Sequence, residues 1–354
     1  MGSRQAAREA FLAGTAWADA TVLPLAADAS TRSYARLAGG PRPALLMDAP
    51  PAAEAAPCPP DASPEERAAL GYNAQARLAG SSLAAFAGLS DWLRARGVRA
   101  PEVYARDDAR GFAVIEDLGD RLLSLAADDD AAERAHYARA LRPLEALRAA
   151  GARVGAKAGG WPLLAYDEAA LMAEVALLPE WYGPYAGAPL GEAATEAFGA
   201  AWRAALSALG PADTLVLRDY HAENILLLDD EETVGVIDFQ DAVIGSSAYD
   251  LASLLEDARR DVGERAARVL FDRFADGAAD RAQFETDYAL LAAQRNTKIL
   301  GIFARLIERD GKPRYAAFMP RVRNHLARDL AREPLAPVRA WAEEHLPELL
   351  GEAL

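Results

Sequence analysis

The chain has 354 residues, 52% of them hydrophobic, which favours a folded protein with a substantial core and two lobes or domains. Its 38 basic and 53 acidic residues give a net charge of -15, so nucleic acid is not an expected partner. Cys58 is the single cysteine and the four histidines form no zinc motif, which excludes a disulfide framework and a Cys/His zinc site. The single cysteine and the lack of a long apolar segment predict a cytoplasmic protein without membrane contact. We also expect a monomer.

The first third of the chain predicts a five-stranded antiparallel sheet. Strand patterns bounded by Gly and Pro occur at TVLPLA, SYARLA and ALLMDA, and two more follow at APEVYARD and GFAVIEDLGD. A Pro/Ala-rich segment at 49–64 lies between the two groups of strands. It precedes two helical patterns, PEERAALGYNAQARLAG and SSLAAFAGLSDWLRARG, the second of which begins at a serine cap and ends at Gly97.

From about residue 120 the pattern is mainly helical. Two strand regions interrupt it, namely TLVLRD and the hairpin NILLLDDEETVGVIDF. We therefore predict an α+β, two-lobed protein, with a β-rich N-lobe at 1–118, a hinge near 116–120 and a helical C-lobe at 119–354.

Polar side chains gather in the loop LRDYHAEN, residues 217–224. If the following hairpin turns about residue 231, Asn224 and Asp238 face each other across the ladder, with Cβ atoms ~5 Å apart. One carboxylate and one amide oxygen are suited to Mg²⁺ beside a nucleotide, because water and phosphate oxygens complete its shell. Asp219, in the same loop, is then placed to orient and deprotonate a substrate hydroxyl.

Each of these residues also has a structural interpretation. A lone Asp or Asn in a loop is most often a turn former or a cap, so the combination, and not any single residue, carries the functional hypothesis. Asp250 precedes an apolar helical stripe, and a capping or loop-bracing role is at least as good an explanation as catalysis. His221 has no second histidine near it in the sequence, so it is expected to bond the loop backbone or touch substrate.

The sequence resembles the aminoglycoside phosphotransferase and choline kinase-like family, whose fold is that of the protein kinases. RDYHAEN, VIDFQDA and SSAYDLASLLEDARRD carry the resemblance to the superfamily. FQDAVIGSSAYDL and QRNTKILGIFARL are similar to the bacterial kinases that phosphorylate N-acetylmuramate and N-acetylglucosamine at the anomeric 1-hydroxyl in peptidoglycan recycling. The resemblance implies ATP and Mg²⁺ as cofactors, Asp219 as the catalytic aspartate and Asn224 and Asp238 as metal ligands.

The resemblance also implies where the nucleotide binds, and here the chain departs from the family. Glu116, Asp117 and Leu118 match the hinge whose backbone meets adenine, and DASTRSYARL matches the phosphate-covering loop. Leu217 replaces the usual loop histidine, and Met47 stands where the phosphate-binding lysine is expected. No lysine precedes Lys157 and no G-x-G is present. Ser30 and Thr31 are therefore expected to cover the phosphates, and Arg32 to replace the lysine; for Arg36, a solvated strand position is an equal alternative.

The substrate contacts are expected to come from the C-lobe. Trp181 and Tyr182 offer flat faces for a pyranose, with helix-end packing as the alternative. Hydrogen bonds are expected from Glu174, His221, Gln240, Asp241 and Arg295. Because N-acetylmuramate carries a carboxylate, its pocket should contain a cation, for which Arg295 and Lys298 are candidates. A kinase of another small alcohol or of an aminoglycoside, and a pseudokinase-type nucleotide-binding module, remain as alternatives.

Overall fold

The computed structural model describes residues 2–26, 31–51, 57–126, 129–229 and 232–351. The chain forms two compact units that alternate along the sequence. Unit 1 comprises Met1–Ala126, Val154–Leu164 and Glu223–Ala242, and unit 2 comprises Ala127–Arg153, Ala165–Ala222 and Val243–Leu354. The functional division at residue 118 stays a prediction, because the compact units are interleaved and do not test it.

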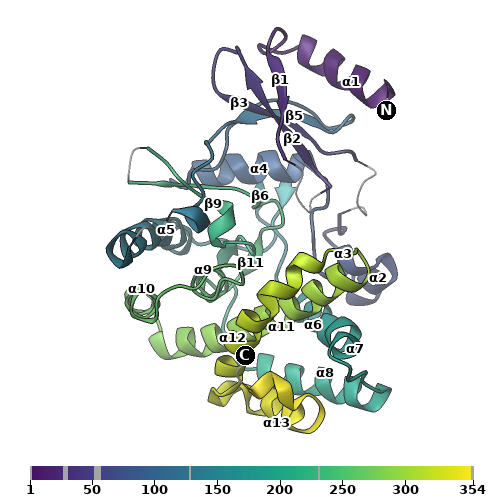
Figure 1. Ribbon diagram of the computed structural model, residues 1–354, viewed down its shortest axis with the longest axis vertical. Helices are drawn as coiled ribbons and strands as arrows, with labels where there is room; N and C mark the ends of the chain where they lie inside the picture. The colour runs from purple at the N-terminus through teal and green to yellow at the C-terminus, as the bar shows by residue number, and fades with distance from the viewer. Residues whose placement is uncertain (1, 27–30, 52–56, 127–128, 230–231, 352–354) are drawn as a thin grey trace. The chain divides into compact units, whose positions relative to one another are not determined.

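Unit 1 contains the predicted five-stranded antiparallel sheet, in the order β1-β2-β3-β5-β4. Its strands are β1 (Thr21–Pro24), β2 (Ser33–Ala38), β3 (Ala44–Asp48), β4 (Val103–Asp107) and β5 (Phe112–Glu116). A helix that the sequence analysis did not predict, α1 (Gly2–Ala13), lies along this sheet (Figure 1). Phe11 of α1 stacks on Phe112 with ring centroids 5.7 Å apart, within an apolar cluster that includes Ala35, Leu37, Ala44 and Leu46.

Alternation along the strands decides which side chains lie on the other face of this sheet. Since the cluster under α1 takes alternate residues of β2 and β3, the remaining positions point away from α1. These are Tyr34, Arg36, Leu45 and Met47. Tyr34 pairs with Met47, and Arg36 with Leu45, across the ladder. One face of the sheet therefore packs in the core with α1, and the other carries Met47 and Arg36, two of the residues that were considered for the nucleotide site.

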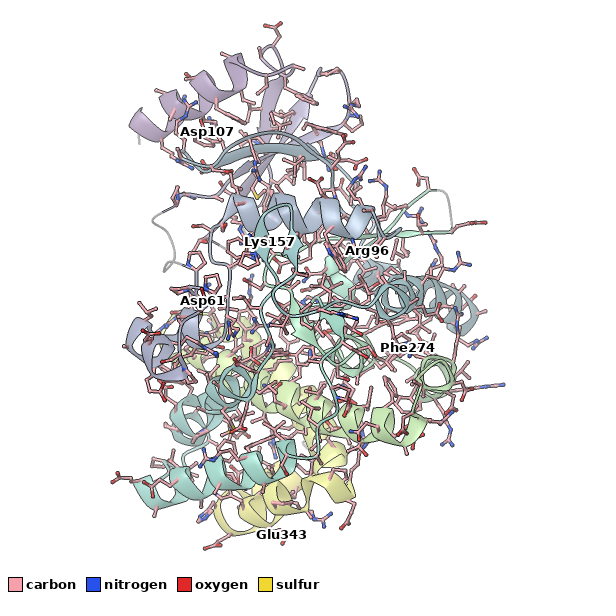
Figure 2. All side chains as sticks on the ribbon, turned by 180° about the vertical axis from the view of Figure 1, so that it is seen from behind. Asp61, Arg96, Asp107, Lys157, Phe274 and Glu343 are labelled. Atoms are coloured by element: carbon pink, nitrogen blue, oxygen red, sulfur yellow. The ribbon has the colours of Figure 1, made fainter. Side chains whose placement is uncertain are left out.

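The remaining elements of unit 1 are short helices and hairpins. They are α2 (Pro64–Leu70), α3 (Tyr72–Gln75), α4 (Leu83–Arg94), the 3-10 helix Leu123–Leu125, and the pairs β6 (Lys157–Ala158) with β7 (Trp161–Pro162) and β9 (Ile225–Leu227) with β10 (Val234–Val236). The stretch at 64–80 is helical as predicted but forms two helices, because Gly71 adopts φ 96° and separates α2 from α3. Ser82 caps α4 as predicted, and β6, which contains Lys157, packs against α4 (Figure 2).

The register of the β9–β10 hairpin differs from the prediction by one residue. Ile225 pairs with Val236, and the Ile237 N–H donates to the Asn224 carbonyl at 3.1 Å, so Asn224 lies opposite Ile237 and not Asp238. The assumed turn centre, residue 231, was the source of the error, and it lies outside the described residues. A shift of one residue normally turns a side chain to the other face. At Asp238, however, the backbone has φ 60°, which redirects the chain after the strand has ended.

Unit 2 is mainly helical and contains one small antiparallel pair, β8 (Thr214–Val216) with β11 (Val243–Gly245); β11 was not predicted. Its helices are α5 (Asp130–Ala150), α6 (Glu168–Val175), α7 (Gly183–Tyr185), α8 (Glu192–Leu206), α9 (Ala248–Leu255), α10 (Glu264–Asp276), α11 (Arg281–Glu308), α12 (Met319–Leu330) and α13 (Ala336–His345), with a π-helix at Leu178–Tyr182 and 3-10 turns at Pro313–Phe318, Glu333–Leu335 and Pro347–Leu350. Helix α11 packs against α6, α9 and α12. Within the described part of the chain, no helix combines the length and apolar character that crossing a membrane requires.

Candidate functional site

Two buried carboxylates hold the loop 217–222 of unit 2 at both ends. Asp250, on α9, accepts hydrogen bonds from the backbone N–H groups of Leu217 at 2.6 Å and Arg218 at 2.9 Å. Asp257 accepts from the Ala222 N–H at 2.9 Å. Burial raises the pKa of Asp250 to about 7, and Asp219 adds to the rise, although the two N–H donors oppose it. Asp250 therefore braces the loop, which was one of the two interpretations from sequence, and Asp257 was missed.

Arg218, immediately before Asp219, is held by both its backbone and its side chain. Its φ is 72°, in the left-handed region that a long side chain seldom occupies. The guanidinium donates to the Glu174 carboxylate, and both side chains are buried. It also lies over the ring of Tyr166, 4.9 Å from the centroid. Asp250 and Glu174 thus fix a strained residue from opposite ends, and the position of Asp219 follows from it.

Glu174 is fully engaged with protein partners. Tyr166 donates its hydroxyl to this carboxylate, Gln294 donates at 2.9 Å, and the Lys298 ammonium lies at 3.3 Å. Burial alone would raise the pKa of Glu174, but Lys298 and Arg218 lower it further than burial raises it, to about 2. Burial likewise disfavours charge on Lys298, yet Glu174 raises the pKa of Lys298 above its ordinary value. Lys298 also donates to the Tyr249 hydroxyl at 2.8 Å. Its charge is balanced by Glu174.

The other members of the loop are placed as follows. Asp219 is half-buried, and its carbonyl accepts from the His221 N–H at 3.0 Å. Burial, reinforced by Arg259, lowers the pKa of His221 to about 3, so this imidazole is neutral at physiological pH. The Tyr220 hydroxyl donates to the Ala140 carbonyl at 2.7 Å. These contacts make the loop a rigid support for one carboxylate, that of Asp219.

Unit 1 contains Asn224 and Asp238, the two residues predicted as metal ligands. Asn224 is 9% exposed, whereas the Asp238 side chain is 47% exposed. Gln240 donates to Asp238 Oδ1 at 2.9 Å, which orients the carboxylate. Among the residues that the structure describes, no three His, Cys, Asp or Glu side chains form a metal cluster. One carboxylate and one amide nevertheless suit Mg²⁺, which commonly keeps several waters and takes phosphate oxygens as its other ligands.

Arg32 lies beside Asp238 in unit 1. Its Nη1 is 3.7 Å from Asp238 Oδ1, and its Nη2 donates to the Gly80 carbonyl at 2.6 Å. Tyr34, which was missed from sequence, lies near both Arg32 and Asp238, and burial raises its pKa. Met47 is completely buried on β3. The structure therefore places a cation near Asp238, in a chain with no lysine before residue 157.

Arginines bind the acidic side chains of the predicted hinge. Arg36 donates to Asp117 at 2.6 Å and to Asp120 at 2.8 Å, so it is not a solvated strand residue. Arg99 donates to Glu116 at 2.6 Å. A cavity of about 380 Å³, lined by residues 99, 116–121 and 227–229, lies at this segment of unit 1. The carboxylates of Glu116, Asp117 and Asp120 are therefore already bound by arginines within unit 1.

The other predicted contact residues are distributed as follows. Tyr182 is 3% exposed and Trp181 half-buried, both in the π-helix, and burial raises the pKa of Tyr182 to about 12. Asp241 accepts from the Ala79 N–H at 2.5 Å in unit 1. Arg295, in unit 2, is 3% exposed. Thr31 is exposed, and Ser30 lies outside the described residues.

Comparisons with known proteins identify relatives along nearly the whole chain. A family model described as "Phosphotransferase enzyme family" matches residues 21–289. The chain is 44% identical over 353 residues to the N-acetylmuramate/N-acetylglucosamine kinase of Caulobacter vibrioides, covering 97% of each chain. It is 34% identical over 322 residues to the protein of that name from Pseudomonas putida, covering 87% of this chain and 83% of the relative.

Solved structures share the fold at low sequence identity. A choline/ethanolamine kinase family protein from Mesorhizobium loti superposes with a TM-score of 0.58 at 15% identity, covering 98% of this chain and 99% of the other. A thermostable mutant of the aminoglycoside phosphotransferase APH(4)-Ia gives 0.57 at 12% identity, covering 88% and 96%. These similarities confirm the predicted α+β, protein-kinase-like fold.

Proposed function

Because the chain belongs to the phosphotransferase enzyme family, we propose that it transfers the γ-phosphoryl group of ATP to N-acetylmuramate, N-acetylglucosamine or both. The observation that carries the substrate assignment is the 44% identity, over 97% of both chains, to a kinase named for these two sugars. Identity at this level along the full length supports a shared substrate class and a shared arrangement of the site.

We propose that Asp219 positions the acceptor hydroxyl of the sugar. Phosphoryl transfer passes through a loose transition state, so positioning of the attacking oxygen and neutralisation of charge contribute more than full deprotonation. The anomeric 1-hydroxyl, the acceptor in this proposal, is more acidic than an ordinary alcohol, so a weaker base is enough to deprotonate it. A half-buried carboxylate on a loop braced by Asp250 and Asp257 suits this task.

Asn224 and Asp238 would hold Mg²⁺, with Gln240 orienting the Asp238 carboxylate. The ion supplies charge neutralisation to the β and γ phosphates when it is bound. Arg32 would bind phosphate oxygens in place of the missing lysine, since a guanidinium can donate to two oxygens at once. Ser30 and Thr31 would cover the phosphates, and the backbone of Glu116–Leu118 would meet the base next to Met47.

Substrate contacts are proposed for His221, Trp181 and Arg295. Tyr182, Gln240 and Asp241 are proposed as supports, because their polar or flat surfaces are buried or bonded within the protein. Glu174 is proposed as a support of the catalytic loop, because both of its oxygens already accept hydrogen bonds. The product would be a sugar 1-phosphate that returns to cell-wall recycling.

The test is phosphorus NMR of the products that purified protein forms from Mg-ATP with each sugar. A phosphate coupled to the anomeric proton supports the proposal, whereas a phosphate on any other carbon would contradict the anomeric assignment. Choline and an aminoglycoside serve as alternative acceptors. Turnover of either, with none for the sugars, would favour another alcohol kinase, and no ADP formation with any acceptor would favour a nucleotide-binding module.

A further inference from the structure

Arg295 is a buried cation of unit 2 that pairs with no carboxylate among the described residues. It lies on α11 and is 3% exposed. Its single hydrogen bond within the described residues runs from Nη1 to the Glu256 backbone carbonyl at 3.2 Å. No ion pair joins it to any carboxylate that the structure describes. A buried arginine is normally paired, because an uncompensated charge is costly to remove from water.

The guanidinium still reaches solvent. Among the described residues, Nε and Nη2 of Arg295 have no hydrogen-bond partner, but neither atom is completely sealed from solvent. The small exposed part of this residue therefore includes nitrogen atoms. Two nitrogens of the planar fork thus have no hydrogen-bond partner among the described residues, and such a fork can bind a carboxylate or a phosphate through two oxygens.

Arg295 is also linked to the loop 217–222 within unit 2. Its Nη1 donates to the Glu256 carbonyl, and the next residue, Asp257, accepts from the Ala222 N–H of that loop. The Arg295 charge opposes the rise in the pKa of Asp250 and adds to the fall in the pKa of His221. The Arg295 charge also contributes to the lowered pKa of His325 on α12. Since Asp250 is also occupied by the loop backbone, it does not neutralise Arg295 as a dedicated partner.

Lys298, one turn further along α11, provides the contrast. It is 7% exposed, but its ammonium is 3.3 Å from Glu174 and donates to the Tyr249 hydroxyl. Of the two cations that the sequence offered for a substrate carboxylate, one is already paired inside the protein and the other is not. Only Arg295 can take up an anion without first breaking an internal ion pair.

We propose that Arg295 is a specificity-determining residue that binds the carboxylate of N-acetylmuramate. This inference rests on the proposed function. Because the guanidinium reaches solvent, water can hydrate it when the neutral N-acetylglucosamine is bound, so both sugars remain substrates. The carboxylate of N-acetylmuramate would add charge-assisted hydrogen bonds that its neutral counterpart cannot make.

The experiment compares kcat/KM for both sugars in wild type and in Arg295→Met. We expect N-acetylmuramate to lose about 10- to 100-fold more than N-acetylglucosamine, the range for a hydrogen bond to a charged group. Arg295→Lys should recover part of this loss, because it keeps the charge without the fork. In addition, wild type should disfavour the methyl ester of N-acetylmuramate, and Arg295→Met should not distinguish acid from ester.

Arg148→Met is the matched control. Arg148, on α5 in the same unit, also donates to a backbone carbonyl, that of Phe274 on α10, at 2.6 Å (Phe274 is labelled in Figure 2). It lies over the Phe274 ring and next to Glu145 and Asp213, not the catalytic loop. Its substitution should leave the ratio between the two sugars unchanged.

Several outcomes overturn the inference. Equal losses for both sugars with a raised KM for ATP would mean that Arg295 binds a phosphate of the nucleotide. Equal losses in kcat alone, or no loss, would mean that it only supports the fold or the loop. In these cases the proposed function stands if wild type phosphorylates the sugars. If wild type phosphorylates neither sugar, the proposed function fails and this inference fails with it.

Discussion

The guanidinium of Arg218 is hydrogen-bonded to the buried carboxylate of Glu174, 44 residues earlier in the chain. Arg218 has φ 72°, and its N–H is bound by Asp250, so side chain and backbone are anchored separately. The next residue is Asp219, the proposed hydroxyl-positioning group. This ion pair connects helix α6 to the loop 217–222 within unit 2.

We predict that Glu174→Gln lowers kcat by about 10- to 100-fold, because displacement of a reacting group by about 1 Å is enough for such a loss. The glutamine preserves shape but removes the charge that holds Arg218. The KM for ATP should change little, since Glu174 binds only unit 2 residues among its described partners, whereas the proposed nucleotide residues belong to unit 1. Steady-state kinetics with ATP and sugar varied separately give both quantities. Glu180→Gln, an exposed acid in the adjoining π-helix, is the control.

A double variant separates positioning from charge balance. Glu174→Gln leaves Arg218 and Lys298 as buried cations without a counter-ion, and Glu174→Gln/Lys298→Met removes one of them. Stability should recover in the double variant, whereas kcat should stay low because Arg218 remains unanchored. Full recovery of kcat would show that Glu174 acts only by balancing charge.

The lowered pKa of Glu174 predicts that the free energy of unfolding depends on pH. The folded pKa of Glu174 is lowered to about 2 from an ordinary 4.5, because Lys298 and Arg218 outweigh the effect of burial. The ionised form therefore stabilises the fold above pH 4.5, and this contribution is lost as the pH falls through 2. It amounts to roughly 3 kcal/mol at neutral pH, from 1.36 kcal/mol per pKa unit.

Urea unfolding of wild type and Glu174→Gln at several pH values measures this contribution. The difference in unfolding free energy should be largest at pH 6 to 7 and shrink steadily below pH 4.5. Taking the difference cancels the titration of other acids, including Asp329. A difference that stays constant down to pH 3 would contradict the lowered pKa of Glu174.

The sheet of unit 1 could be predicted because its strands carry local signals. Each is bounded by Gly or Pro, and alternation assigns its two faces, so all five strands were found. β11 was missed because VIG is a short apolar run inside a polar stretch. The hairpin register was missed because it depends on the turn, where no periodicity applies, and there one residue decides which side chains face each other.

The candidate site residues Asp219, Asn224 and Asp238 could be proposed from sequence, since they lie in one polar loop and in the hairpin that follows it. Their supports could not. Asp257, Tyr166 and Gln294 reach the loop or Glu174 through contacts 8 to 120 residues apart in sequence, which no local pattern encodes. Likewise, Arg36 could not be assigned to Asp117 before strand β2 and the hinge were in place.

Asp238 should control the response to magnesium. We predict that Asp238→Ala abolishes turnover at ordinary Mg²⁺ and that Asn224→Ala raises the Mg²⁺ concentration needed for half-maximal rate, since each removes a proposed ligand. Because the Asp238 side chain is 47% exposed, the melting temperature should change little. Rate against Mg²⁺ concentration and Mn²⁺ binding by electron paramagnetic resonance measure the effects.

Asp229→Ala is the control for the metal site, because this fully exposed acid belongs to the same hairpin region and pairs with Arg121 at 3.4 Å. Its Mg²⁺ dependence should match wild type. If Asp238→Ala binds Mn²⁺ as tightly as wild type does, the assignment of Asp238 as a ligand is wrong.

The last prediction concerns Arg32, the proposed replacement for the missing phosphate-binding lysine. Its side chain is 8% exposed and lies 3.7 Å from Asp238, fixed by the Gly80 carbonyl. We predict that Arg32→Ala raises the KM for ATP by about 10- to 100-fold, the range for losing hydrogen bonds to a charged group. Arg32→Lys should restore part of the affinity, since it keeps a charge but donates from a single point. Arg106→Ala, on β4 with a side chain that is 39% exposed, is the control. An unchanged ATP requirement in Arg32→Ala, measured at saturating sugar, would mean that another group replaces the lysine.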